Sequence, residues 1–162
     1  MSAISAARAM GAIWSGTGAG VPAGVYAQVQ QFYTWQMGLL EGDEADPEAW
    51  AATFTEDAVF ASTVQPEPER GRAAILASVR AGVAGIAAQR LDFRHWFGMV
   101  GVEEGDEEGS LRTRYYALAM ATPRGGSLKV RGSLLCYDDL VRGESGGLLV
   151  ARRTLVADGR SG

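Results

Sequence analysis

The hydrophobic period of this chain changes once, near residue 91, from about 3.6 residues to about 2. From there, apolar or aromatic side chains alternate with the rest, so one face of an extended strand would carry Leu91, Phe93, His95, Phe97 and Met99. Similar segments cover 111–122, 128–141 and 148–157, and turn-forming stretches occupy 103–109 and 123–126. The second half of the chain is therefore predicted to be a meander of long strands.

The first half has helical spacing instead. Apolar residues after Pro22 recur at intervals of three and four, which predicts a helix over 22–41. The Asp46-Pro47 pair is a typical helix start and predicts a short helix through Trp50 and Phe54. Residues 71–89 form a third predicted helix, preceded by a short strand at 58–63 and a loop at 64–69.

Helices first and paired strands last predict an α+β fold. Long antiparallel sheets twist and curl, so we expect N-terminal helices packed in the concave face of a curved, mostly antiparallel sheet. Such a cone-shaped α+β barrel encloses space for a ligand pocket. Residues 21–158 are predicted to be one domain, and the Gly/Ala-rich residues 1–20 a flexible tail.

Composition excludes several classes of function. The formal net charge is −4 and the arginines are scattered, so a nucleic-acid partner is not expected. The sequence offers no apolar run of membrane-spanning length and no signal peptide, so we expect no membrane partner and a cytoplasmic location. One cysteine, Cys136, and one histidine give no metal-ligand spacing, and phosphate-binding motifs are absent, so neither a metal nor another cofactor is expected.

His95 is the residue that most strongly indicates chemistry. Phe93 and Phe97 flank it on its own face, and an apolar setting disfavours the charged imidazolium. A neutral imidazole near pH 7 can take or give a proton. The alternative is a core histidine with satisfied hydrogen bonds.

Several segments resemble one known group of proteins. They are "QFYTWQMGLLEGD", "WAATFTEDAVFAST", "GRAAILASVR", "FRHWFG", "RTRYYALAMATPRGG" and "LLCYDDLVR". The chain resembles the SnoaL-like and scytalone dehydratase-like members of the nuclear transport factor 2-like superfamily, which include polyketide cyclases, dehydratases, isomerases and non-catalytic subunits.

The resemblance implies site residues by position. The sheet histidine of scytalone dehydratase-like members matches His95, and their second histidine falls at Tyr116. Their helix-end carboxylate falls near Glu41, a pocket tyrosine is replaced by Phe60, and a pocket asparagine falls near Tyr137. The aspartate base of ketosteroid isomerases would fall at Ser62.

The resemblance, combined with the alternation of side chains along a strand, also implies which side chains enter the pocket. The inward position of the matching residue in the family places Tyr116 inside, together with Arg114, Leu118 and Met120. Tyr137 is expected on the inner face with Leu135, Ser133 and Arg131, and one of Asp138 and Asp139 must also alternate inward. The predicted catalytic residues are His95, Tyr116 and Glu41. The predicted substrate-binding residues are Tyr137, Phe60, Tyr33, Phe97, Leu118 and Arg131.

Two functions are compatible with this pattern. The first is a cofactor-independent cyclase, dehydratase or isomerase that acts on an aromatic polyketide-type intermediate, with His95 moving a proton and Tyr116 stabilising an oxyanion. The second is a non-catalytic binding or accessory protein, such as an intermediate carrier or a small-subunit-like partner of an oxygenase. By analogy, a homodimer through the outer face of the sheet is expected, with Arg112, Trp96 and Arg152 on that surface.

Overall fold

The computed structural model describes Trp14 and residues 20–159 of the chain. Helices α2 (Ala23–Gly38), α3 (Pro47–Ala51) and α4 (Arg72–Ala88) fill most of the first half. The strands are β1 (Phe54–Ser62), β2 (Glu69–Arg70), β3 (Leu91–Glu104), β4 (Leu111–Pro123), β5 (Lys129–Arg142) and β6 (Leu148–Ala157). The predicted tail, residues 1–20, lies almost wholly outside the described residues, and the domain boundaries stay a prediction.

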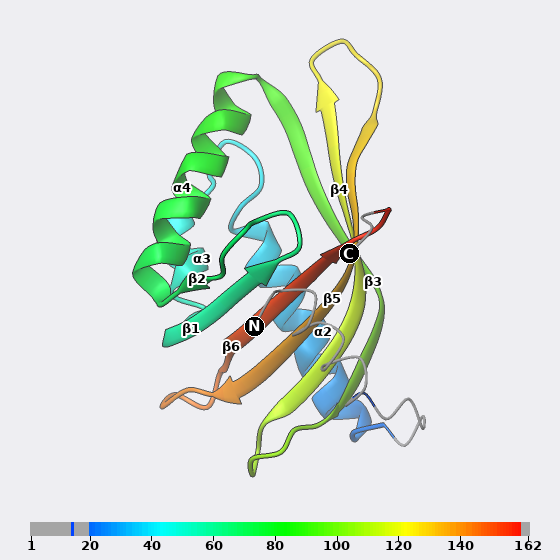
Figure 1. Ribbon diagram of the computed structural model, residues 1–162. Helices are drawn as coiled ribbons and strands as arrows, with labels where there is room; N and C mark the ends of the chain where they lie inside the picture. The colour runs from blue at the N-terminus through cyan, green and yellow to red at the C-terminus, as the bar shows by residue number, and fades with distance from the viewer. Residues whose placement is uncertain (1–13, 15–19, 160–162) are drawn as a thin grey trace.

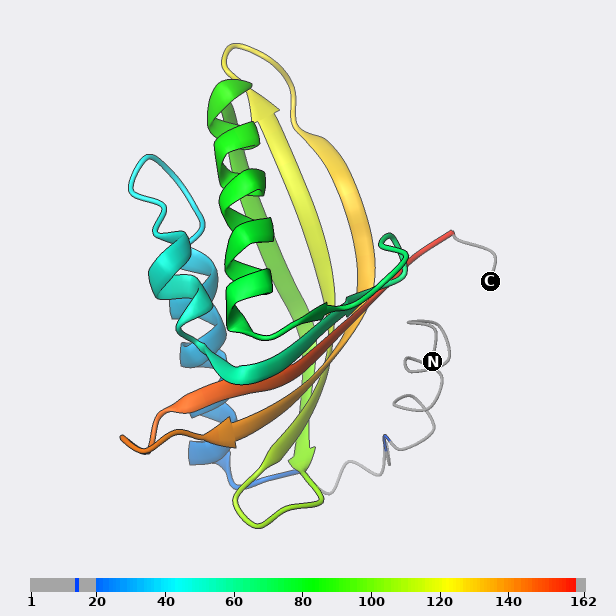
Figure 2. The ribbon, with the colours of Figure 1, turned by 60° about the vertical axis from the view of Figure 1, so that its left-hand side comes forward.

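The strands form one curved, six-stranded sheet in the order β2-β1-β6-β5-β4-β3. Neighbouring strands pair antiparallel except β1 and β6, which run parallel. The helices lie against the concave side of this sheet (Figures 1 and 2). The predicted α+β class, with helices packed in a curved, mostly antiparallel sheet, is confirmed.

Local sequence explains the short helix and corrects its predicted end. Asp46 caps α3 by accepting a hydrogen bond from the backbone N–H of Ala49 at 2.9 Å, and Pro47 occupies the first turn. The prediction carried this helix through Phe54, which was wrong. The helix ends at Ala51, and Phe54 begins β1, where it is fully buried.

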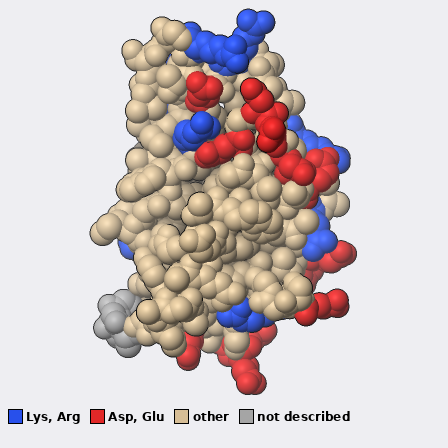
Figure 3. Space-filling model, turned by 180° about the vertical axis from the view of Figure 1, so that it is seen from behind, with Lys and Arg blue, Asp and Glu red and all other residues tan. Residues whose placement is uncertain are grey.

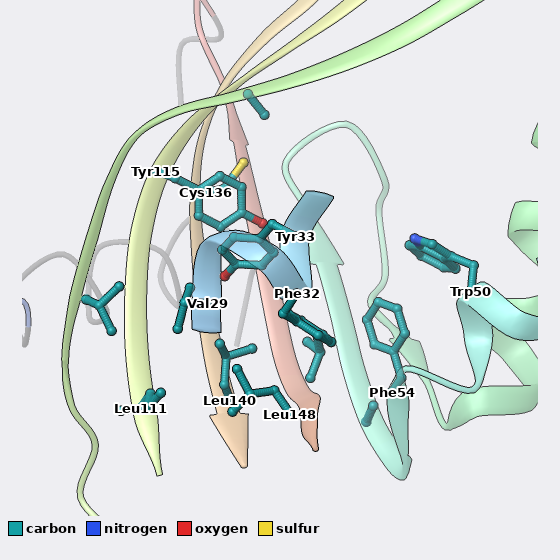
Figure 4. Close-up of a cluster of buried hydrophobic side chains, with 14 of the residues drawn as sticks. Val29, Phe32, Tyr33, Trp50, Phe54, Leu111, Tyr115, Cys136, Leu140 and Leu148 are labelled. Atoms are coloured by element: carbon teal, nitrogen blue, oxygen red, sulfur yellow. The ribbon is translucent and has the colours of Figure 1, made fainter. Parts of the chain in front are cut away.

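The core lies between α2 and the concave face of the sheet. Val29, Phe32 and Tyr33 of α2 pack toward Tyr115, Leu140 and Leu148 of the strands (Figure 4). Burying such side chains stabilises the fold by roughly 1.5–3 kcal/mol each. This packing fixes which face of each long strand points inward.

The structure corrects the predicted inner faces of β4 and β5. Inward positions on β4 are Thr113, Tyr115, Ala117, Ala119 and Ala121, so Tyr116, Leu118 and Met120 lie on the outer face. On β5, Cys136 is paired with Tyr115 and faces inward, whereas Leu135 is paired with Tyr116 and faces outward. The predicted inner face of β5 is therefore reversed as well. Since side chains alternate, a one-residue error in parity reverses every side chain of a strand.

A second correction concerns Met99, which was predicted to share the face of His95 and Phe97. The pairing of β3 with β4 shifts between Gly98 and Gly101, and Met99 has a φ of 52°. This bulge turns Met99 outward, where it is 74% exposed.

Candidate functional site

A cavity of about 250 Å³ lies between the helices and the concave face of the sheet. Most of its lining is apolar, and its polar lining residues are Trp50, Gln65, Glu69, Ser78, His95 and Arg153. Larger hollows of about 510 and 560 Å³ lie elsewhere, the first beside Gly42 and Arg124 and the second beside Asp106 and Arg152. We identify the smaller cavity as the candidate site because it contains His95 and buried polar atoms.

His95 reaches this cavity from β3, as its strand position predicts. Its ring packs against Phe93, with ring centres 5.0 Å apart, and Phe97 is another lining residue. Burial, with a further contribution from the positive charge of Arg153, lowers the pKa of His95 to about 4. The imidazole is therefore neutral at pH 7.

Glu41 holds the strand that carries His95. Its Oε1 atom accepts a hydrogen bond from the backbone N–H of His95 at 2.8 Å, and lies 4.0 Å from Nδ1 of the imidazole. The second separation is too long for a hydrogen bond. Among the described residues, buried Nδ1 has no hydrogen-bond partner. Glu41 is thus a candidate positioning residue for His95.

A buried ion pair, absent from the predicted site, lies next to the cavity. Arg153 of β6 donates hydrogen bonds from Nε and Nη2 to the carboxylate of Asp138, at 2.9 and 2.7 Å. Burial opposes the charge of Arg153, but Asp138 more than compensates and raises the pKa of the guanidinium. Arg153 also lines the cavity and stays positively charged there.

The hydroxyls of two tyrosines complete the surroundings of Asp138. Tyr33 donates to Oδ2 at 2.9 Å, and Tyr115 lies 3.2 Å from Oδ1. Burial raises the pKa of Tyr33 well above its usual value, and the charge of Asp138 raises it further. Burial likewise raises the pKa of Tyr115 well above its usual value. Both phenols stay protonated and act as donors. Tyr33, predicted to bind substrate, lies in this network and outside the cavity lining.

The other predicted site residues divide into two groups. Phe60 and Phe97 line the cavity. Arg131, which lies at the register shift between β4 and β5, does not line it. Nor do Tyr116, Tyr137 and Leu118, which the parity of β4 and β5 places on the outer face. There Tyr116 and Tyr137 meet Arg114 and raise the pKa of its guanidinium, mainly through a hydrogen bond with Tyr116. The sequence-based prediction placed Tyr116 beside Arg114 but did not join either residue to Tyr137, and it assigned both tyrosines to the inner face.

Sequence reasoning missed Asp138 and Arg153 as a pair, and placed Trp50 only in the short helix. The signal for the pair was the register of the last two strands, in which Asp138 lies opposite Arg153. Cys136 is a free, buried cysteine, and burial raises the pKa of its thiol, which disfavours the reactive thiolate. Within the described residues, His, Cys, Asp and Glu do not gather into a metal-binding group.

A curved sheet with helices on its concave side and a largely apolar cavity defines a small-molecule-binding α+β class. The model of the SnoaL-like domain family matches residues 24–154. The chain therefore belongs to the SnoaL-like domain family. No curated protein matches it.

Solved structures agree with this assignment. Aln2 from a Streptomyces species is 34% identical with a TM-score of 0.76, over 86% of this chain and 94% of that one. ActVI-ORFA from Streptomyces coelicolor is 32% identical with a TM-score of 0.77, over 87% and 100%. A protein from Catenulispora acidiphila in complex with S-DNPA is 35% identical with a TM-score of 0.71, over 86% and 97%.

Proposed function

We propose that this protein is a cofactor-independent cyclase, dehydratase or isomerase that acts on an aromatic polyketide-type intermediate. The observation that carries the proposal is a neutral imidazole, with an unpartnered Nδ1 within the described structure, in the wall of an apolar cavity. Membership of the SnoaL-like family, which includes polyketide cyclases and dehydratases, supports this reaction class. Fold alone would not, since one fold serves many functions.

His95 would act at a carbon next to a carbonyl group. In a dehydration, the imidazole takes a proton from that carbon, and the electrons of the C–H bond move onto the carbonyl oxygen to form an enolate. The enolate then re-forms the carbonyl and expels a hydroxyl from the β-carbon, and the imidazolium gives that hydroxyl its proton, so that water leaves. Because the pKa of His95 is about 4, its imidazolium is a strong proton donor for this last step.

The proposed enzyme needs a different oxyanion stabiliser from the predicted one. Tyr116 is 43% exposed on the outer face and does not line the cavity. The guanidinium of Arg153 lines the cavity, held by its ion pair with Asp138, and a preorganised dipole of this kind can stabilise negative charge that develops beside the guanidinium. Arg153 therefore replaces Tyr116 in the proposal.

The test is turnover by the purified wild-type protein. A panel of two-ring aromatic β-hydroxyketones would be incubated with the protein alone, without added cofactor or metal, and water loss followed by absorbance and mass spectrometry. Protein-dependent dehydration or cyclisation is the expected result. Saturable binding of the panel without any conversion would contradict the proposal.

The second candidate function is a non-catalytic binding or accessory protein. One observation favours it: Tyr116, which the resemblance matched to the family's second histidine, points away from the cavity. A binding protein would be stabilised by the ligand in proportion to RT ln(1 + [L]/Kd) and would return it unchanged. The turnover assay therefore separates the two functions.

We also propose a homodimer through the outer face of the sheet, in the cytoplasm. Trp96, Met99 and Tyr116 expose 54%, 74% and 43% of their surface there. A second surface, seen from behind in Figure 3, also carries little charge, because α2 has no charged residue between Ala23 and Gly38. None of the described helices has the length and apolarity to cross a membrane.

The proposed dimer is tested by light scattering after size exclusion, which should give twice the monomer mass for wild type and a monomer for Trp96→Glu. A dimer that survives this substitution would argue against the outer face.

A further inference from the structure

Two buried polar atoms besides His95 Nδ1 have no hydrogen-bond partner among the described residues, and both belong to residues that line the same cavity. They are Nε1 of Trp50 and Oε1 of Gln65. Leaving a buried polar atom unpaired is costly, and native proteins pair nearly all such atoms. Their shared location makes both atoms available to a ligand in the cavity.

Gln65 presents an acceptor. Its Nε2 atom donates a hydrogen bond to Oε1 of Glu69 at 3.0 Å. A carboxylate only accepts hydrogen bonds, so the amide nitrogen must be the atom facing Glu69. The remaining atom, the buried carbonyl Oε1, is therefore a fixed acceptor.

Trp50 presents a donor. The indole N–H can only donate a hydrogen bond, and the residue is 5% exposed. Its ring packs against Phe54 and Phe60, with ring centres 4.7 and 6.4 Å apart. It is carried by the capped helix α3, so the direction of the N–H is set by packing and not by solvent.

We infer that Trp50 and Gln65 recognise two oxygen functions of the ligand, a carbonyl oxygen that accepts from Trp50 Nε1 and a hydroxyl that donates to Gln65 Oε1. This inference rests on the proposed function and names its substrate class: a small hydroxylated aromatic ketone, whose reacting carbon faces His95. The size of the cavity, about 250 Å³, is below the 300 Å³ or so at which drug-sized ligands begin, which favours a two-ring framework.

Three matched compounds test the two contacts separately: 5-hydroxy-1-tetralone, which has both groups, 1-tetralone, which lacks the hydroxyl, and 5,6,7,8-tetrahydro-1-naphthol, which lacks the carbonyl. Their dissociation constants would be measured by calorimetry on wild type, Trp50→Phe and Gln65→Leu. Phenylalanine keeps an aromatic ring without the N–H, and leucine keeps the length of the apolar stem without the acceptor.

In wild type, the hydroxytetralone should bind about 3–10-fold more tightly than either analogue, as expected for one added hydrogen bond. Trp50→Phe should weaken only the two ketones by that factor, and Gln65→Leu only the two phenols. Equal loss for all three compounds in either variant would show a packing effect and overturn the inference. So would a hydroxytetralone that binds wild type no better than its analogues.

The outcome of this binding test does not depend on whether the proposed catalytic function is correct. None of the three compounds has a β-hydroxyl to lose, so the dissociation constants do not depend on turnover. His95→Gln should leave the preference for the hydroxytetralone over its analogues within about twofold of wild type. A preference that disappears in this variant would contradict the assignment of recognition to Trp50 and Gln65.

Discussion

The carboxylate of Glu41 accepts a 2.8 Å hydrogen bond from the backbone N–H of His95 and thereby joins the segment after α2 to the edge strand β3. Because β3 is an edge strand, part of its backbone lacks a neighbouring strand to bond with. Glu41 supplies that partner at the one residue proposed to move a proton. Glu41 therefore positions His95 through its backbone N–H and not through a hydrogen bond to the imidazole ring.

Substitution of Glu41 separates positioning from charge. Glu41→Ala should lower kcat by roughly 10-fold with little change in KM. A poorly aligned His95 raises the activation free energy, and about 1.4 kcal/mol in that barrier corresponds to a factor of ten in rate. Glu41→Gln should restore most of the activity, since an amide oxygen can also accept from the His95 N–H. If Glu41→Gln were as impaired as Glu41→Ala, the negative charge and not the hydrogen bond would be the important property.

The depressed pKa of His95 predicts a pH dependence of stability. The unfolded chain binds this proton with a pKa near 6.5 and the folded protein with one of about 4, so the unfolded state holds more protons between these values. Stability from this group is fully present above pH 6.5 and is lost as the pH falls toward 4. The loss should be about 2 kcal/mol, since a quarter of the side chain still meets solvent.

Denaturant unfolding at pH 7, 6, 5 and 4.5 checks this prediction. His95→Gln is the control, because it lacks the titrating group while other carboxylates titrate as in wild type. The free energy of unfolding should fall more steeply for wild type than for the variant. Parallel curves would mean that His95 titrates normally in the folded protein.

The buried pair of Asp138 and Arg153 should be important for stability. Asp138→Leu leaves the guanidinium without its carboxylate and should cost about 3–5 kcal/mol. The double variant Asp138→Leu with Arg153→Met should recover part of that loss, because no uncompensated charge remains. Equilibrium urea unfolding measures both; additive losses in the double variant would contradict the pairing.

Two adjacent tyrosines provide a matched test of strand parity. Tyr115 is fully buried and its hydroxyl contacts Asp138, whereas Tyr116 is exposed on the other face. Tyr115→Phe should lower the free energy of unfolding by about 1.5–3 kcal/mol through the lost bond to a charged group. Tyr116→Phe should change stability by less than about 0.5 kcal/mol and leave turnover unchanged. A large loss of turnover in Tyr116→Phe would restore the sequence-based assignment.

The fold could be predicted because its signals are periodic. The change of period near Leu91, the Asp46-Pro47 start and the turn at 123–126 each act locally, and the structure has elements at those places. Phe54 was harder, since one aromatic residue fits the end of a short helix as well as the start of a strand. Its burial beneath Trp50 and Phe60 decided the matter through tertiary packing.

The site was only partly predictable. His95 is flanked by aromatic residues on a strongly alternating strand, so its inward direction followed from sequence. On β4 and β5 both faces carry apolar and aromatic side chains, for example Tyr115 and Tyr116, and alternation alone cannot choose between them. Small inner residues such as Ala117 and Ala119, which leave room for the cavity, were the unused signal.

Replacement of His95 by glutamine tests whether its imidazole moves the proton. The kcat of His95→Gln would be measured on the substrate found in the turnover assay, with folding verified by circular dichroism and thermal unfolding. Positioned proton transfer contributes about 10²–10⁴-fold, so kcat should fall by at least 100-fold while the ligand still binds. A variant that folds normally and turns over at the wild-type rate would exclude His95 as the residue that moves the proton.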